Sequence, residues 1–292
     1  MIIPAYNESE NLEECVRGVQ NAMKGLSYEI IIVDDGSNDG TAEVARKLSM
    51  TYDNVVCLKH PTTLGKTQAI RSGFAKSSGD IIVLLDADLQ YEPKDILKLI
   101  NVMDEHGFDV VNGLRVNRAD PFSKRFASRI FNFFANFVFG LSFRDFNSGL
   151  KAFRRNVLEQ IPLRADYHRY LLGIAQRGGY KVTEVPVNHY PRIHGRSKYS
   201  FKRLFLGGAD LLSLQLELSL SRRPMLMFGS LSALFFLVGL AVGLYALFTG
   251  GISVRPAVLL SISLILASVQ FLATGFIADL VLQVREALKS SD

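Results

Sequence analysis

The chain has 292 residues, a formal net charge of +5 and 48% hydrophobic residues, which is enough for one large α/β domain and a smaller second part. Its basic residues fall at 115–129, at 192–203 and beside an apolar tail, and they form no stripe interleaved with stacking aromatics. This distribution argues against a nucleic-acid partner and favours an anionic membrane surface or an anionic substrate.

The first hundred residues alternate strand-like and helix-like patterns. After a short opening run, continuous apolar runs typical of strands buried on both faces occupy 28–33, 55–58, 80–85 and 108–111. Apolar residues at helical spacing fill the stretch from Leu12 to Met23, and Asn7 followed by Glu10 predicts a capping box at its start. Pro93 predicts the first turn of a later helix. This order predicts an α/β fold with a Rossmann-like, doubly wound and mostly parallel sheet.

Residues 121–143 are dense in phenylalanine, with Lys124, Arg125 and Arg129 interleaved. Such a stretch forms either a core helix or a helix that lies in the membrane interface. The phenylalanines occupy too much of the helix circumference for a single core stripe, so we favour the interface. Residues 201–220 are a second candidate of the same kind.

The tail of the chain is apolar: residues 225–248 and 256–278 carry no charged side chain. Each run exceeds the ~20 residues that cross a bilayer core, so we expect a transmembrane hairpin at 225–280 and a globular domain at 1–220. The alternative is a buried helical hairpin in a soluble protein. Basic residues flank both runs, whereas the short link holds only Arg255. By the positive-inside rule, the chain is an integral membrane protein whose globular domain is cytoplasmic. The opening residues, which lack the basic start of a secretory signal, agree with this expectation.

Polar clusters follow three of the predicted strands. They are Pro4-Ala5-Tyr6-Asn7-Glu8, Val33-Asp34-Asp35-Gly36-Ser37 and Leu85-Asp86-Ala87-Asp88-Leu89-Gln90. Because ligands of doubly wound sheets bind beyond the carboxyl ends of the strands, we expect these clusters to converge. Their carboxylates would repel one another, which predicts a divalent cation and a ligand with hydroxyl or N–H donors among them.

Asp86 and Asp88 stand two positions apart directly after an apolar strand. Side chains at i and i+2 of an extended chain point the same way, so both carboxylates can approach one ion. With diphosphate oxygens and water they complete the octahedron that Mg²⁺ or Mn²⁺ prefers. The motif therefore predicts a metal that offsets the charge of a departing nucleoside diphosphate.

Gly65-Lys66-Thr67 is similar to the end of a P-loop, whose first glycine would stand at position 60. His60 occupies that position, which argues against a nucleoside triphosphate site. Lys66 is then either a contact to the phosphate of another ligand or a solvated lysine in the first turn of a helix.

The clusters at 4–8, 33–37, 64–66 and 86–90 together resemble the family-two glycosyltransferases of GT-A fold. Within that family the chain is similar to dolichyl-phosphate mannosyltransferase and to the bacterial polyprenyl-phosphate glycosyltransferases. Two later segments, Asp145-Phe146-Asn147-Ser148-Gly149-Leu150 and His194-Gly195-Arg196-Ser197-Lys198-Tyr199, resemble motifs of that subgroup. The resemblance covers about residues 1–220. The chain has no Trp, so the Gln-x-x-Arg-Trp motif of processive synthases is missing.

The resemblance implies roles for the residues at matching positions. It implies nucleotide-sugar contacts for Pro4, Tyr6, Glu8, Val33, Asp35, Asp86, Ala87 and Asp88, to which we add Lys66 as a phosphate contact. It implies metal ligands at Asp86, Asp88 and Gln90. The expected catalytic set is Asp88, Arg115, Arg129, Asp145, Arg196 and Lys198, in which the four basic residues face phosphates of donor or acceptor. Asp145 either orients the acceptor or a cationic side chain, or caps a turn.

These expectations combine into a hypothesis: inverting transfer of a hexose, mannose or glucose, from a GDP- or UDP-sugar to dolichyl or polyprenyl phosphate. The cofactor would be Mg²⁺ or Mn²⁺. A phosphate acceptor is already ionised near neutral pH, whereas a hydroxyl acceptor needs a carboxylate to take its proton. Two alternatives stay open: a glycosyltransferase that acts on a hydroxyl of a lipid or glycan, and a non-catalytic membrane protein that binds nucleotide sugars. The sequence also leaves the oligomeric state open.

Overall fold

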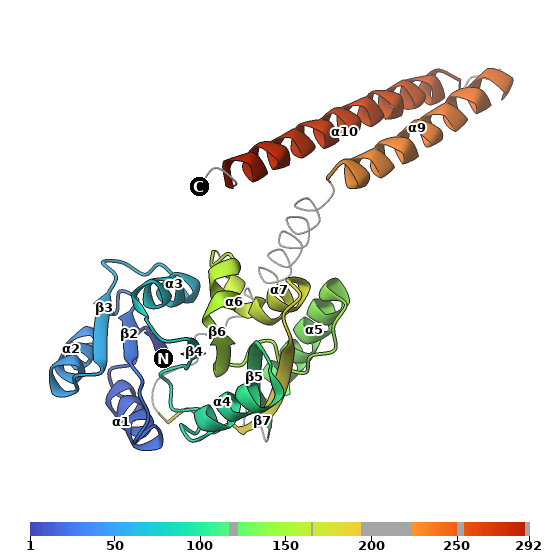
Figure 1. The fold of residues 1–292 in the computed structure, drawn as a ribbon. Helices are drawn as coiled ribbons and strands as arrows, with labels where there is room; N and C mark the ends of the chain where they lie inside the picture. The colour runs from blue at the N-terminus through green and yellow to red at the C-terminus, as the bar shows by residue number, and fades with distance from the viewer. Residues whose placement is uncertain (117–121, 165, 194–223, 250–253, 290–292) are drawn as a thin grey trace. The chain divides into compact units, whose positions relative to one another are not determined.

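The computed structural model describes residues 1–116, 122–164, 166–193, 224–249 and 254–289 (Figure 1). The chain forms two compact units, Met1–Asp210 and Leu211–Asp292. The predicted interfacial stretch 201–220 and the predicted phosphate contacts Arg196 and Lys198 lie outside the described residues.

The first unit is built on a seven-stranded sheet of order β3-β2-β1-β4-β6-β5-β7. Its strands are β1 Ile2–Ala5, β2 Ile30–Asp34, β3 Val55–Lys59, β4 Ile81–Leu84, β5 Val110–Val116, β6 Lys151–Arg154 and β7 Val182–Asn188. Strands β1 to β4 pair in parallel, as do β5 and β7, whereas β6 runs antiparallel to both β4 and β5. The predicted mostly parallel sheet is confirmed. Strands β6 and β7 are additional to the four runs that the pattern predicted after β1.

Helices cover both faces of the sheet (Figure 1). They are α1 Leu12–Ala22, α2 Thr41–Thr51, α3 Lys66–Lys76, α4 Asp95–His106, α5 Phe122–Phe139, α6 Arg155–Gln160 and α7 Leu171–Arg177, with a 3-10 turn η1 Tyr167–Arg169. One core cluster joins the apolar stripes of α1, α2 and α4 to alternate side chains of the strands, such as Ile3 and Ile32. On the opposite face α3 packs closely: a Cβ at Gly73 would lie 2.5 Å from a side-chain carbon of Ile2.

Two details of the helix starts were predicted wrongly. Asn7 does not cap α1, because it has a left-handed backbone with φ of 52° and its side chain accepts a hydrogen bond from the Asn38 N–H at 3.0 Å. The helix begins at Leu12, whose N–H donates to the Glu8 carbonyl at 3.0 Å. Pro93 likewise precedes α4, which begins at Asp95, rather than standing in its first turn.

Helix α5 presents one buried and one exposed aromatic face. Phe131 and Phe139 are buried, and the ring of Phe131 stacks on Tyr170 at 5.7 Å between centroids. On the other side Phe133, Phe134 and Phe137 are 68%, 54% and 80% exposed. The helix is therefore part of the core along one stripe and leaves an apolar surface along another. We call the exposed set, Phe133, Phe134 and Phe137, the aromatic face of α5.

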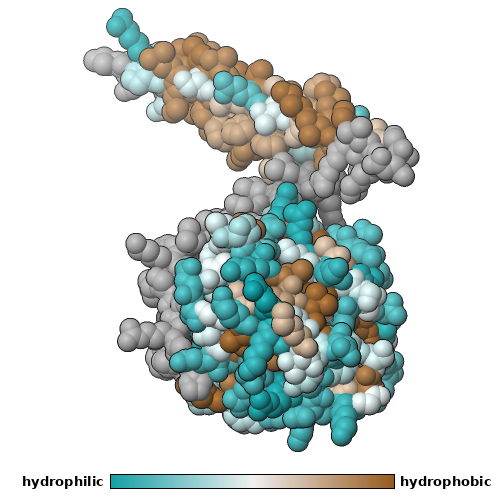
Figure 2. All heavy atoms as spheres, turned by 90° about the vertical axis from the view of Figure 1, so that its left-hand side faces the viewer, coloured by the Kyte–Doolittle hydropathy of each residue, from teal (hydrophilic) through white to brown (hydrophobic). Residues whose placement is uncertain are grey.

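The second unit contains two long helices, α9 Pro224–Thr249 and α10 Val254–Lys289. The segments Pro224–Phe248 and Arg255–Val284 are long and apolar enough to cross a membrane, and only 17% and 11% of their most apolar windows are buried. A core helix of a soluble protein would be mostly buried, whereas these two helices are largely exposed within their own unit. Figure 2 shows hydrophobic residues along the visible face of this pair. Polar side chains join the helices, as where the Ser232 hydroxyl donates to the Ser268 carbonyl at 2.7 Å.

Candidate functional site

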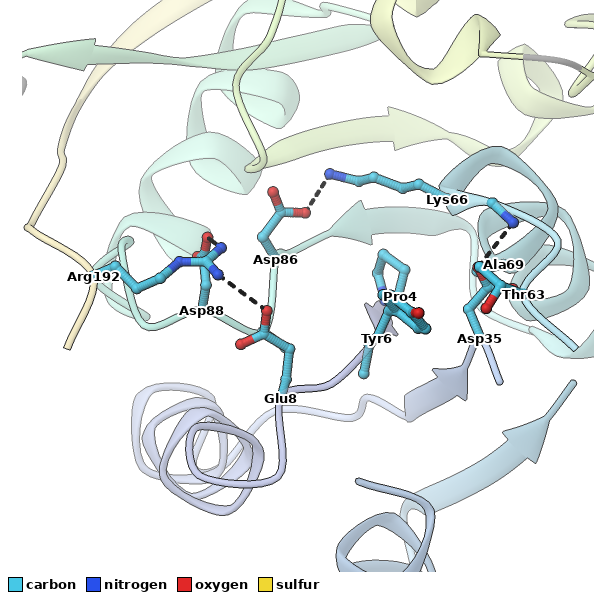
Figure 3. Close-up of a pocket in the computed structure, with 13 residues that line it drawn as sticks. Pro4, Tyr6, Glu8, Asp35, Thr63, Lys66, Ala69, Asp86, Asp88 and Arg192 are labelled. Atoms are coloured by element: carbon cyan, nitrogen blue, oxygen red, sulfur yellow. Dashed lines mark hydrogen bonds and ion pairs between the residues drawn. The ribbon is translucent and has the colours of Figure 1, made fainter. Parts of the chain in front are cut away.

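A pocket of about 250 Å³ opens at the carboxyl ends of β1, β2 and β4, which are neighbours in the sheet. Its lining consists of Pro4, Ala5, Tyr6, Glu8, Asp35, Thr63, Gly65, Lys66, Ala69, Asp86, Ala87, Asp88 and Arg192 (Figure 3). The predicted convergence of the three polar clusters is thus seen in the fold. One carboxylate departs from it, because Asp34 is buried within β2 and lines no part of this pocket.

Two cations of the chain neutralise the aspartates that follow β4. The Lys66 ammonium forms an ion pair with Asp86, and the Arg192 guanidinium donates to Asp88 at 2.7 Å and to Glu8 at 3.4 Å. Lys66 is the first residue of α3, preceded by Gly65 with a backbone φ of 95° that favours glycine. Lys66 therefore stands in the pocket wall, paired with Asp86 and partly exposed.

Arg192 reaches the pocket through a contact between distant segments. The Tyr190 N–H donates to the Gln90 carbonyl at 2.9 Å, and Tyr91 forms an isolated antiparallel bridge with His189. Leu89 makes the turn with a left-handed φ of 58°, a strained conformation for a residue with a branched side chain. Arg192 is not among the site residues that the sequence predicted. Its only signal was membership of the basic run at 192–203.

Burial raises the pKa of Asp88, and the nearby Asp86 charge raises it further, whereas Arg192 acts in the opposite direction. This carboxyl is almost fully enclosed, so its charged form depends on a compensating cation.

The segment 148–151 packs against the carboxylate of Asp86, through Gly149. A Cβ at Gly149 would lie 2.3 Å from Oδ2 of Asp86, so only glycine lets the carboxylate occupy its position. The Gly149 N–H donates to the Tyr91 hydroxyl at 2.6 Å, and the Lys151 ammonium donates to the Ser148 carbonyl. Burial, assisted by the charge of Lys66, lowers the pKa of Lys151 to about 7.

Arg115 and Asp145 form a buried two-point ion pair. Nε and Nη2 of Arg115 lie 2.6 Å and 2.8 Å from the two carboxylate oxygens of Asp145. Glu184 of β7 accepts from the backbone N–H of Asp145 at 3.0 Å and thereby holds the same loop. Asp145 is thus paired with a cationic side chain, an arrangement that fits one of the roles considered for it.

Five predicted site residues among those that the structure describes, Asp145 included, lie away from the lining of this pocket. Val33 is buried inside β2, and the Gln90 amide donates to the Tyr190 carbonyl at 3.0 Å. Arg115 is engaged with Asp145, and Arg129 is exposed on α5. The structure therefore brings together Pro4, Tyr6, Glu8, Asp35, Lys66, Asp86, Ala87 and Asp88 from the predicted set.

The donor set of the pocket fits a metal that is shared with a ligand. Within the described ranges no group of three or more His, Cys, Asp or Glu residues is arranged to hold a metal alone. Asp86 and Asp88 supply carboxylate oxygens on one side of the pocket, and phosphate oxygens and water would complete six-fold coordination. The chemistry of these residues suits Mg²⁺ or Mn²⁺ bound together with a diphosphate.

The chain is similar to known sugar transferases. Curated relatives include undecaprenyl-phosphate 4-deoxy-4-formamido-L-arabinose transferases of Salmonella choleraesuis (strain SC-B67) and Salmonella paratyphi B, each 37% identical over 216 residues. The match covers 73% of this chain, and the chain spans 66% of the length of these relatives.

A similar solved structure is glucosyl-3-phosphoglycerate synthase from Mycobacterium tuberculosis in complex with Mn²⁺, uridine diphosphate and glucosyl-3-phosphoglycerate. It has a TM-score of 0.58 and 20% sequence identity, and the match covers 74% of this chain and 77% of that one, so the likeness concerns the fold. Residues 1–162, more than half of the chain, match the family model described as glycosyl transferase family 2. The chain therefore belongs to the family-two glycosyltransferases and has their GT-A fold.

Proposed function

We propose that the protein transfers a sugar from a nucleotide diphosphate sugar to a polyprenyl phosphate. One observation carries this proposal: Asp86 and Asp88, which follow β4, both line the pocket, and each is paired with a cation of the chain. This arrangement suits a metal–diphosphate pair, which brings both positive and negative charge into the pocket. The curated relatives, named as undecaprenyl-phosphate sugar transferases, support the class of acceptor.

Asp86 and Asp88 would hold a divalent cation, Mg²⁺ or Mn²⁺, and Gln90 would join them after its side chain turns from Tyr190. When bound, the cation offsets negative charge on the departing diphosphate. Lys66 and Arg192 already stand in the pocket wall, so they can turn from the aspartates to the diphosphate oxygens. Arginine suits this task because its fork binds two oxygens at once.

The transfer itself would be a single displacement. An acceptor phosphate oxygen forms a bond to the anomeric carbon, the bond from that carbon to the diphosphate breaks, and its electron pair leaves with the nucleoside diphosphate. The anomeric centre is thereby inverted. The acceptor oxygen is ionised near neutral pH, so the site needs positioning and charge stabilisation rather than a strong base. Asp86, Asp88 and Asp145, which are all paired with cations, fit that requirement.

Phosphate contacts remain a proposal for Arg115, Arg129, Arg196 and Lys198. Among them, Arg115 is held by Asp145, so Asp145 would act as a positioning residue for that guanidinium. Tyr6, Pro4 and Asp35 would contact the nucleoside, and Ala87 the diphosphate, as their places in the lining suggest.

The membrane would supply the lipid acceptor to a catalytic domain at 1–220 on the cytoplasmic side. The helices α9 and α10 would span the bilayer, and the aromatic face of α5 would lie in its interface. Phe133 and Arg129 are four residues apart on α5, so a cation stands next to this aromatic face and could meet anionic headgroups.

The test is an assay of the purified full chain in nanodiscs with Mn²⁺, undecaprenyl phosphate and a panel of donors. The panel includes UDP-glucose and GDP-mannose, which represent the hexoses expected from the sequence, and a UDP-linked 4-deoxy-4-formamido-L-arabinose. We expect a lipid product that mild acid hydrolyses, because a glycosyl phosphate is labile. An acid-stable product would favour a hydroxyl acceptor, and no product with any donor would favour a non-catalytic binding protein.

The metal assignment has its own test. Asp88→Asn should lower Mn²⁺-dependent turnover by on the order of 10²-fold or more, because it removes a charged ligand of the leaving-group cation. Asp104→Asn is the matched control, since Asp104 forms an exposed ion pair with Arg154. Turnover of the Asp88→Asn protein close to that of the control would contradict the assignment.

A further inference from the structure

Three polar side chains occupy paired positions on the strands β6, β5 and β7, which are neighbours in the sheet (Figure 1). Asn112 of β5 pairs directly with Lys151 of β6 on one side and with Glu184 of β7 on the other. Residues that are paired across strands point to the same face of a sheet, so the three form one row, which we call the polar row. Asn112 is 0% and Lys151 is 3% exposed. A buried amide or ammonium costs free energy unless it is hydrogen-bonded, so the partners of these groups show what the row does.

The polar row holds the backbone of the loop between α5 and β6. Glu184 accepts hydrogen bonds from the backbone N–H groups of Arg144 at 2.7 Å and of Asp145 at 3.0 Å. Nδ2 of Asn112 donates to the Asp145 carbonyl at 2.7 Å and to Oε1 of Glu184 at 3.0 Å. Both backbone polar groups of Asp145 are therefore bound by the row. Buried backbone groups of a loop need such partners, because no helix or strand satisfies them.

Lys151 holds the other end of this loop. Its ammonium donates to the Ser148 carbonyl, and the next residue, Gly149, packs against the carboxylate of Asp86. Burial is the main reason why the pKa of Lys151 is lowered to about 7, whereas the charges of Asp145 and Asp86 act in the opposite direction. The ammonium thus lies within electrostatic reach of both carboxylates.

The loop thereby connects two parts of the proposed site. At one end the Asp145 carboxylate binds the Arg115 guanidinium through two contacts, of 2.6 Å and 2.8 Å. At the other end Gly149 leaves room for Asp86, the proposed metal ligand. The polar row fixes the backbone between these ends, and none of its three side chains lines the pocket. The row can therefore act on a ligand in the pocket only through the loop.

We propose that the polar row is a positioning device for the transfer reaction, which holds the loop 144–149 so that Arg115 and Asp86 keep a fixed separation. The inference rests on the proposed function, in which Asp86 holds the metal and Arg115 contacts a phosphate. Position matters because a displacement of about 1 Å can cost on the order of 10²-fold in rate. The three strands pair through their backbones, so a substitution in the row leaves the hydrogen bonds of the sheet in place. Its effect should therefore appear in turnover.

The experiment is a double-mutant cycle between Glu184 and Arg115. It measures kcat/KM in nanodiscs with Mn²⁺, undecaprenyl phosphate and a donor that the unaltered chain uses. Glu184→Gln keeps the size of the side chain but sets an amide NH₂ against a backbone N–H, so the Asp145 end of the loop should shift and kcat/KM should fall at least about fivefold. In the Arg115→Gln background the same change should lower kcat/KM by less than about twofold, because the guanidinium that the loop positions is gone. Glu159→Gln, at an exposed position of α6, is the matched control and should leave kcat/KM unchanged.

A second readout separates positioning from general damage to the fold. In Glu184→Gln, Lys151 still holds the Asp86 end of the loop. The Mn²⁺-dependent affinity for UDP or GDP, whichever the unaltered chain binds, should therefore change by less than about twofold. Calorimetry on the full chain in detergent measures this affinity. Loss of nucleotide binding in Glu184→Gln would show that the row only supports the fold, and would overturn the inference.

Asn112→Asp gives the cycle a second variant, so the test does not depend on the folding of one protein. It has the same size but loses both N–H donations and sets a carboxylate beside Glu184, so its effect on kcat/KM should likewise vanish in the Arg115→Gln background. An equal factor in both backgrounds, for either variant, would refute the positioning role, as would an unchanged kcat/KM in Arg115→Gln itself. If the unaltered chain makes no product with any donor, the proposed function fails instead.

Discussion

Gly149 has no side chain, and this leaves room for the charged carboxylate of Asp86. The carboxylate of Asp86 rests where a Cβ at 149 would lie, 2.5 Å from Cγ of Asp86 and 3.0 Å from the Tyr91 ring. Gly149→Ala should therefore displace Asp86, lower Mn²⁺ affinity and turnover by about tenfold or more, and destabilise the fold by roughly 1–3 kcal/mol through overpacking. Gly79→Ala is the control, because its Cβ would meet only a backbone oxygen at 3.7 Å. Unaltered Mn²⁺ affinity would show that Asp86 is not the metal ligand.

The raised pKa of Asp88 predicts how binding depends on pH. A metal binds the carboxylate and competes with the proton, so Mn²⁺-dependent nucleotide binding should weaken as pH falls through that raised pKa. This loss occurs at a higher pH than for an ordinary aspartate, whose pKa is about 3.9. Arg192 lowers the pKa of Asp88, so Arg192→Gln should raise it and shift the loss of binding to still higher pH.

Calorimetry across a pH series measures this shift. The titration of the nucleotide is common to all samples, so only the difference between proteins counts. Arg154→Gln is the control, since it breaks an exposed pair with Asp104. Equal pH midpoints for Arg192→Gln and the control would contradict the proposed coupling.

Local sequence rules located most of the pocket but not its charge balance. The rule that ligands bind beyond strand ends placed Glu8, Asp35, Asp86 and Asp88 together, and the structure agrees. Arg192 was not predicted as a site residue because its position depends on the bridge between the segments near 90 and 190, which no local pattern encodes. The same holds for the engagement of Arg115 by Asp145, a pairing across 30 residues.

At the scale of elements, helices α1 and α4 and strands β2 to β5 followed from the apolar patterns, whereas β6 and β7 did not. Lys151–Arg154 is short and includes a buried lysine, so its pattern gave no strand signal. Because β6 lies between β4 and β5 in the sheet, the segment 148–151 that leads into it packs against the carboxylate of Asp86. In β7, Val185 and Val187 are buried while Pro186 is exposed, which fits a strand at the sheet edge. Tertiary packing, rather than propensity, decided both strands.

Helix α5 carries the prediction that belongs to this scale. The chain has no Trp, so Phe137→Trp introduces a single fluorescent reporter on the aromatic face. In proteoliposomes its emission should shift to the blue, and lipids brominated near the headgroup should quench it, because the interface is less polar than water. Met50→Trp on α2 is the matched control, since Met50 and Phe137 are both 80% exposed. Equal quenching of the two proteins would place α5 outside the interface.

At the scale of the whole molecule, the distribution of charge predicts its orientation in the membrane. Arg222 and Arg223 precede α9 and basic residues follow the apolar part of α10, whereas Arg255 stands alone near the link between the helices. Both ends of the hairpin should therefore be cytoplasmic and the link should be on the opposite side. This orientation also places the catalytic unit on the side where nucleotide sugars are made.

Cysteine labelling can test that orientation with little interference from the native thiols. Burial raises the pKa of Cys15 to about 12 and also raises the pKa of Cys57, so neither supplies much reactive thiolate near neutral pH. In intact cells a membrane-impermeant maleimide should label Gly250→Cys, in the link, and should label Ser291→Cys only after permeabilisation. The reverse pattern would put the active site on the outer side. In that orientation the chain would depart from the positive-inside rule, and the enzyme would need a donor other than a cytoplasmic nucleotide sugar.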